Sequence, residues 1–286
     1  MVLALAHDGL PLAPHDALLA WTFEPGTVLP LAAAILLYMK GQRRMDARSG
    51  RRVGSSSRRY FFAGSAVLAL ALVSPLHAMG SALFTAHMVQ HELLMLVAAP
   101  LLVLGRPVAP WLFALPRGAR RAVGGASRVA PIRGAWRMLS HPLVAFLLHA
   151  AAIVTWHLPA LYGATLRSNA LHGAQHASFF LTALIFWWSL IGHARPARRG
   201  VAIVALFGTA LYTGGIGALL TLSTTPWYPA YGESALAWGL TPLEDQQLGG
   251  MVMWMPGGVA YLVAAIAVAH AWLRGPRIRQ PLPVPG

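Results

Sequence analysis

Residues 201–222 read VAIVALFGTALYTGGIGALLTL and contain no charged side chain. A helix that crosses the hydrocarbon core of a membrane needs roughly 20 mostly apolar residues, so this stretch is long enough to span it. Six other segments approach that length and are similarly apolar: Glu24–Met39, Tyr60–Leu76, Leu83–Leu104, Pro142–Trp156, Leu171–Ile191 and Met251–Leu273. The sequence therefore predicts an all-α polytopic membrane protein, a bundle of about seven transmembrane helices.

The composition supports the membrane class and narrows the chemistry. Hydrophobic residues make up 57% of the chain and charged residues 10%, a balance that is unusual for a soluble globular protein. There are no cysteines, which excludes disulfides, thiolate metal sites and thiol nucleophiles. A soft metal ion would therefore have to be bound by histidine or methionine.

Positive charge lies on alternate connections between the apolar segments. Of the 22 Lys and Arg residues, all except Arg167 fall on one set of alternating connections and on the C-terminal tail. Cytoplasmic loops are enriched in Lys and Arg, which predicts an outside N-terminus and a cytoplasmic C-terminus. The expected parts are an extracytoplasmic segment (1–23), a seven-helix membrane domain (24–273) and a cytoplasmic tail (274–286), which we expect to be disordered. The net charge of +14 is thus explained by the orientation of the chain in the membrane. No nucleic-acid partner is predicted.

The outer connection, Ser223–Leu248, is rich in turn formers and aromatic rings. It carries Pro226, Trp227, Tyr228, Pro229 and Tyr231. Such amphipathic rings are typical of the headgroup level of a membrane. We expect this segment to lie over the outer end of the bundle and to cap it.

Six of the 12 histidines fall at the outer ends of predicted spans, on four different helices: His77, His87, His91, His157, His172 and His176. Two pairs stand four residues apart, in HMVQH (87–91) and HGAQH (172–176), which places both imidazoles of each pair on one helix face. Ionisable groups within spans are costly and usually functional. Neutral imidazole with thioether suits copper, especially Cu(I), whereas imidazole alone also suits zinc or haem iron. The alternative is that they are interfacial histidines bonded to the backbone or to one another.

Secondary ligands are available at a similar depth. Glu92 follows His91 inside a predicted span and could orient an imidazole or accept a proton, or could be a paired structural carboxylate. Met95 extends the 87–91 stripe by one turn. Asp245, Met251 and Met255 stand at the start of the last span, where methionine is more often a packing residue than a ligand.

Several short motifs together resemble one known family, the multi-spanning CtaG-type cytochrome c oxidase assembly factors. These motifs are HMVQH (87–91) followed by LMLVAAPLLVLG (94–105), WHLP (156–159) with Tyr162, LHGAQHASF (171–179) with FWW (186–188), and DQ (245–246) with GG (249–250) and WMPGG (254–258). The resemblance covers the second to the seventh span. Glu92 departs from it, because an apolar residue is expected there. It implies a bacterial inner-membrane protein that is needed to build a haem–copper oxidase and handles its copper.

The leading hypothesis is that the outer histidines bind copper as Cu(I) and deliver it to the oxidase without enzymatic turnover. His87, His91, His172 and His176 would be the main ligands, and His77 and His157 would be further ligands or would support the ligands without contacting the ion. The expected partners are cytochrome c oxidase subunits or other copper chaperones, with membrane lipid around the bundle; a homodimer is left open.

Two rival hypotheses remain. One is a redox protein that holds haem b between two histidines, and the other is a copper transporter, for which His149 is a mid-span histidine. A retinal protein is excluded, because the sole lysine, Lys40, lies in an inner loop and cannot form the Schiff base.

Overall fold

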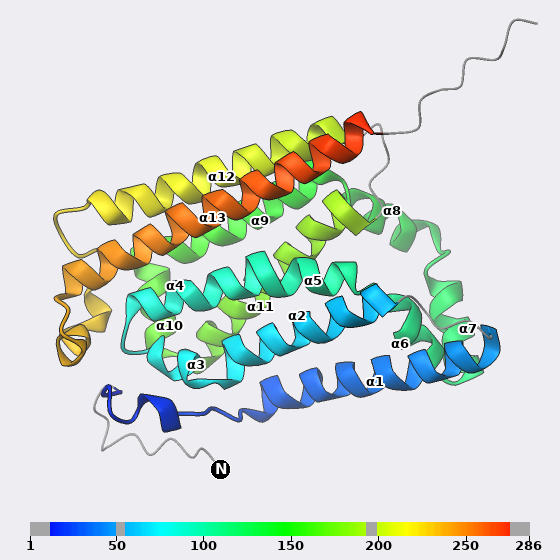
Figure 1. Cartoon of the computed structure of the whole chain (residues 1–286), viewed down its shortest axis with the longest axis horizontal. Helices are drawn as coiled ribbons and strands as arrows, with labels where there is room; N and C mark the ends of the chain where they lie inside the picture. Colours follow the sequence, from blue (N-terminus) through cyan, green and yellow to red (C-terminus); the bar gives the residue numbers. More distant parts are fainter. Residues whose placement is uncertain (1–11, 50–54, 193–198, 275–286) are drawn as a thin grey trace, which may run out of the picture.

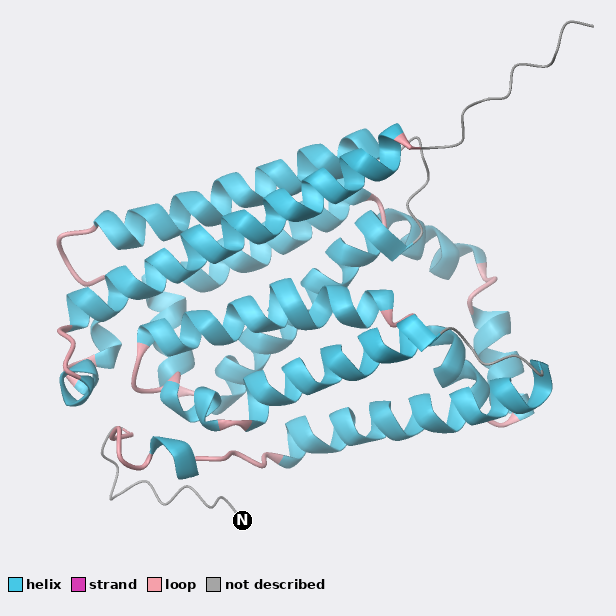
Figure 2. Ribbon diagram, in the orientation of Figure 1, coloured by secondary structure: helices cyan, strands magenta, loops and turns pink. Residues whose placement is uncertain are grey.

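A computed structural model describes residues 12–49, 55–192 and 199–274, and every regular element within these ranges is helical (Figures 1 and 2). To within a few residues at their ends, the seven predicted apolar segments correspond to helices or runs of consecutive helices: α1 (Pro25–Ser49), α2 (Ser55–Val73), α4 with η2 and α5 (Phe84–Glu92, Leu93–Ala98, Ala99–Leu104), α9 (Pro142–His157), α11 with η3 (Asn169–Trp187, Trp188–Gly192), α12 (Arg199–Leu222) and α13 (Pro242–Leu273). The second predicted segment, Tyr60–Leu76, runs past the end of α2 into a short helix. The segments η2 and η3 are π-helical.

Four of these helices are both long and apolar enough to cross a membrane: Phe84–Leu104, Asn169–Gly192, Arg199–Leu222 and Pro242–Leu273. A fifth candidate pairs α9 with the preceding α8 (Ala130–Leu139), although the two are bent by 69°. The all-helical membrane class is thus confirmed. The count of seven spans and the orientation of the termini remain predictions.

Two helices are longer than the hydropathy pattern suggests. α1 continues through the basic residues after Met39 to Ser49, because arginine and lysine are good helix formers. α13 begins at Pro242, nine residues before Met251, where Thr241 and Glu244 form a reciprocal capping box that satisfies the free N–H groups of the first turn. The predicted tail, 274–286, lies outside the described residues except for Arg274, as do residues 1–11 of the N-terminal segment.

Short helices connect the long ones. They are η1 (Ala17–Leu19), α3 (Pro75–Met79), α6 (Val108–Ala114), α7 (Arg117–Ala126), α8, α10 (Pro159–Arg167), η5 (Pro229–Tyr231) and η6 (Ser234–Trp238). Figure 1 shows α3, α10 and the α12–α13 connection at one end of the bundle, and α6, α7 and α8 at the other. We call the first of these the histidine end, because it carries the residues described below.

The main apolar core lies between α5, α9, α11 and α12. Phe179, Phe186 and Leu206 are fully buried there, and Trp187 Nε1 donates a hydrogen bond of 2.8 Å to the carbonyl oxygen of Met95. This core holds the helices that carry the histidines in a fixed relation to one another.

α12 and α13 lie side by side along their whole length (Figure 1) and approach most closely at glycines. A Cβ atom on Gly217 would lie 2.7 Å from the carbonyl oxygen of Gly250 and 2.9 Å from the amide nitrogen of Trp254. Only glycine permits backbones to approach this closely, as is common between helices in membranes.

Candidate metal centre

Five of the six predicted histidines form one continuous group of imidazole rings at the histidine end. His77 is on α3, His87 and His91 are on α4, and His172 and His176 are on α11. Ring centroids lie 4.2 Å apart for His172 and His176, 4.4 Å for His87 and His91, and 5.0–5.9 Å for the contacts between helices. The sixth, His157 at the end of α9, shares Phe179 as a ring contact with His91. The structure therefore brings the predicted ligands together.

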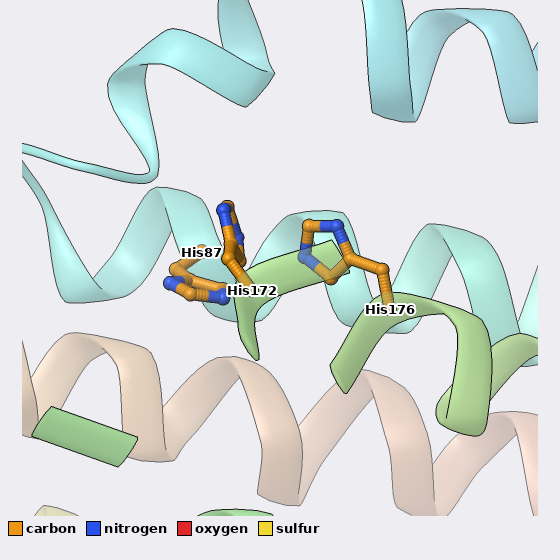
Figure 3. A group of neighbouring side chains, drawn as sticks. All are labelled: His87, His172 and His176. Carbon is orange, nitrogen blue, oxygen red and sulfur yellow. The ribbon is translucent and has the colours of Figure 1, made fainter. Parts of the chain in front are cut away.

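Three of these histidines have the geometry of a metal site. One ring nitrogen each of His87, His172 and His176 lies within 4.8 Å of the others, and Figure 3 shows the three rings gathered between the two helices. An ion placed among them would lie within reach of all three after small rotations, since metal–imidazole bonds are about 2.0–2.1 Å long. Two helices thus bring three imidazole nitrogens together.

Buried imidazole nitrogens here have no hydrogen-bond partner within the described chain. They are His87 Nε2, both ring nitrogens of His91, His157 Nε2, His172 Nε2 and His176 Nε2. A buried polar atom without a partner costs about 1–3 kcal/mol, and native structures contain few of them. Five histidines with unpaired nitrogens in one place fit a ligand set for an ion.

A tyrosine from the outer connection orients His87. Tyr231 donates its hydroxyl hydrogen to the carbonyl oxygen of Gly80, at 3.0 Å, so its oxygen is left to accept from His87 Nδ1–H, at 3.1 Å. Burial holds the pKa of the Tyr231 phenol well above its usual value, which keeps that hydrogen in place. His87 then carries its proton on Nδ1 and presents the Nε2 lone pair to the cluster, as metal-binding histidines commonly do.

His157 is prepared in the same way. Its Nδ1 lies 2.7 Å from the carbonyl oxygen of Ile153, which can only accept, so the proton is on Nδ1. Nε2 is then free to bind an ion.

His77 has the opposite arrangement. The Gln90 amide nitrogen donates to the carbonyl oxygen of Ala71 and to His77 Nδ1, at 2.7 and 2.8 Å. Burial lowers the pKa of His77, and the neutral ring that accepts at Nδ1 must carry its proton on Nε2. His77 stacks on His172, with an interplanar angle of 5°, so it supports the cluster as it stands and could bind an ion only after releasing Gln90.

The first turn of α4 is capped from a distant part of the chain. The carboxylate oxygens of Asp245 accept from the backbone N–H groups of Phe84 and Thr85, at 2.6 and 3.0 Å. This carboxylate satisfies two of the free donors of the helix and offsets its dipole. By fixing the first turn of α4, Asp245 helps to position His87 and His91, which lie one and two turns further along the helix.

The other secondary candidates lie away from the ring cluster. Met95 packs in the main apolar core. Met251 and Met255 lie on the outward face of α13, with exposed fractions of 42% and 60%. Glu92 Oε2 is buried without a hydrogen-bond partner in the described ranges, and it would lie 3.1 Å from a Cβ on Gly257; this glycine makes room for the carboxyl group against α13.

Sequence reasoning missed three contributors to the site. Tyr231 was expected at the headgroup level, but it packs in a buried aromatic cluster with Phe84, Tyr162 and Tyr228. Gln90 and Gln175 are both fully buried beside the histidines. The two glutamines could have been found from the sequence, because each directly precedes the second histidine of its pair, in HMVQH and HGAQH.

If the cluster binds copper, replacing Tyr231 with phenylalanine should weaken that binding by about 10–100-fold, the usual effect of losing a group that orients a metal ligand. The variant leaves His87 Nδ1–H without its acceptor and frees the ring to turn. Titration of the reduced protein with Cu(I) in competition with a chromogenic chelator would measure the change. Tyr228→Phe is the matched control, because its hydroxyl donates to the backbone carbonyl of His157. Equal affinities of the two variants would contradict the role given to Tyr231.

The family model "Cytochrome c oxidase caa3 assembly factor (Caa3_CtaG)" matches residues 36–275. Uncharacterised proteins of Mycobacterium bovis and Mycobacterium tuberculosis are each 30% identical over 227 residues, which is 75% of this chain and 33% of the relative. The chain thus spans about a third of the length of the curated relatives it matches. No solved structure matches the sequence.

Proposed function

The chain belongs to the cytochrome c oxidase caa3 assembly factor family, and from this we propose that its histidine cluster binds copper as Cu(I) and delivers it to the oxidase during assembly. The family supplies the role in assembly. The proposal for copper rests on the donor set of this chain, since imidazole and thioether are the soft ligands that a chain without cysteine can offer.

The single observation that carries the proposal is the group His87, His172 and His176, with one ligand nitrogen of each within 4.8 Å of the others. Their Nε2 atoms are buried and unpaired in the described structure. His91 and His157 add unpaired nitrogens beside this group. A site of neutral imidazoles suits Cu(I), because imidazole and thioether are the ligand types that this chain can offer to a soft ion, and Cu(I) brings only a single positive charge into the site.

Surplus ligands suit delivery better than storage. A closed tetrahedral site holds its ion firmly, whereas a site with more donors than the ion requires lets one bond form before another breaks. Copper can therefore move among the imidazoles and leave by exchange with a ligand of the acceptor. This chemistry requires no turnover of a substrate by the protein.

The packing of the rings argues for an ion over haem b. A haem held by two histidines needs a flat slot between facing imidazoles. Here the contacts between rings from different helices, at centroid distances of 5.0–5.9 Å, fill the space with other imidazoles. His149, the mid-span histidine of the transport hypothesis, stacks on Phe186 and contacts Thr182 Oγ1 at 2.9 Å. Its Nε2 atom is also unpaired in the described ranges, but its ring makes none of the contacts with the five clustered imidazoles.

The first test is a metal analysis of the purified protein in detergent after loading with Cu(I) under reducing conditions, with an absorption spectrum alongside. About one or more copper ions per chain, without a Soret band, is the expected result. A Soret band would replace the copper proposal with the haem alternative. If neither copper nor haem is present, the histidine cluster is structural.

A further inference from the structure

A long groove runs beside the histidine cluster. It has a volume of about 1910 Å³ and is lined mostly by apolar side chains of the segment 12–24 and of α1, α2, α5, α6 and α11. α1 packs along α2 and α6, while α11 packs along α5 and α9, which leaves the space between α1 and α11. Thr22, three residues before α1, donates its amide hydrogen to the carbonyl oxygen of Val73 at the end of α2, at 3.0 Å, which ties the start of α1 to α2.

The groove is as long as a membrane is thick. Along α11 its lining extends from Asn169 to Trp188, about 28 Å at the helical rise of 1.5 Å per residue. This matches the hydrocarbon core of a bilayer, about 30 Å. The volume exceeds the roughly 300–1,000 Å³ of small-molecule sites, so the dimensions fit a transmembrane helix better than a compact ligand.

The chemistry of the lining also points to a helix. No Lys or Arg is among the lining residues, and the acidic groups, Asp16 and Glu24, are at the histidine end. On α11, Gly173 and Ala177 line the groove together with His172 and His176. Small residues at a spacing of four permit close approach of a second helix, and a Cβ on Gly173 would meet nothing within 4 Å.

We propose that this groove docks a transmembrane helix of the oxidase subunit that receives the copper, with a histidine or methionine of that helix next to His172 and His176. The inference rests on the proposed function and names its partner surface. His176 is 7% exposed and has an unpaired Nε2 atom, so the docked helix would meet the ligand set at its edge, along the groove wall.

Transfer along this route is a ligand exchange. A neutral imidazole or thioether of the docked helix forms a bond to Cu(I) while the bond from His172 or His176 breaks. The ion remains Cu(I), the released imidazole remains neutral, and no proton or electron is required. The groove brings the acceptor ligand close without opening the cluster to water.

Photo-crosslinking in membranes of cells that assemble the oxidase tests the docking. A p-benzoylphenylalanine that replaces Gly173 projects into the groove, and the same residue in place of Gly215, an exposed glycine of α12 that also has nothing within 4 Å, projects from another face. We expect the variant with the probe at position 173 to form an adduct with a membrane-embedded oxidase subunit. The variant with the probe at position 215 should form none. Adducts with lipid only, with a second copy of this chain, or equal oxidase adducts from both positions would overturn the proposal.

A blocking variant tests the consequence for delivery. Gly26 lines the groove from the α1 side and has open space around it. Gly26→Trp should retain copper in the purified protein but lower the copper content of the assembled oxidase by about tenfold, since overpacking the groove should cost about one decade of affinity; Gly215→Trp is the control. Unchanged oxidase copper would overturn the docking site. The crosslink does not depend on copper, so a chain that binds no copper would refute the proposed function separately.

Discussion

Replacing His87 and His176 together with alanine should abolish the proposed Cu(I) binding and leave the helical bundle folded. The double variant removes one nitrogen donor from α4 and one from α11, two of the three that lie within 4.8 Å of one another. The affinity should fall by more than about 100-fold, because even an orienting group outside the ligand shell is worth 10–100-fold. Copper per chain after loading under reducing conditions measures the effect, and circular dichroism checks the fold.

The fold should survive because the lost Nε2 atoms have no hydrogen-bond partners in the part of the chain that the structure describes. The substitutions therefore remove unsatisfied polar atoms as well as side-chain volume. His141→Ala with His270→Ala is the matched control, since these histidines are not among the ring contacts of the cluster. Copper retained at wild-type affinity in His87→Ala with His176→Ala would refute the ligand assignment.

Substituting leucine for Gly217 should destabilise the protein by at least about 1–3 kcal/mol, the usual cost of overpacking a well-packed interface. A Cβ at this position would lie 2.7 Å from Gly250 O and 2.9 Å from Trp254 N, which are backbone atoms that cannot rotate away. α12 and α13 must then separate and lose contact along both helices. Thermal or denaturant unfolding in detergent, followed by circular dichroism, would show the loss.

Gly215→Leu provides the control two residues away. A Cβ at Gly215 meets nothing within 4 Å, so leucine there should change stability little and gain helix propensity over glycine. If both variants unfolded at the same temperature or denaturant concentration, the close approach of α12 and α13 would not be the source of the effect. Copper binding by surviving Gly217→Leu protein would show whether this helix pair also supports the histidine end.

Hydropathy was enough to locate the helices, because continuous apolar runs such as 201–222 are signals that need no tertiary information. The two HxxxH pairs were equally readable, since a spacing of four residues dictates a common face on any helix. That the pairs would meet could be suspected from their common side of the predicted bundle. The ring contacts between His87 and His172 and between His91 and His176 confirm that they do.

The features that sequence reasoning could not supply are contacts between distant segments. Tyr231 reaches His87 across 144 residues, and no local pattern distinguishes it from an aromatic residue of the headgroup level. His77 was expected as a further ligand or a supporting residue, and its bond to Gln90 places its proton on the nitrogen that would otherwise bind the ion. Proton positions of this kind depend on neighbours in space.

The role of Asp245 also depends on a contact with a distant segment that the sequence does not reveal. Beside three methionines at the start of a span it was a reasonable candidate ligand, but its carboxylate caps α4. The start of α13 was also misplaced, because the capping box of Thr241 and Glu244 extends the helix through polar residues that a hydropathy profile excludes.

During synthesis, Phe84 leaves the ribosome well before the carboxylate that caps it. Asp245 lies 161 residues later, an interval of roughly 8 to 32 s at 5–20 residues per second. In that interval α4 has both of its histidines but not its cap, and for most of it Tyr231 has yet to be made. The candidate site is therefore complete only after this region has been translated, and α4 must enter the bundle without the carboxylate that caps it.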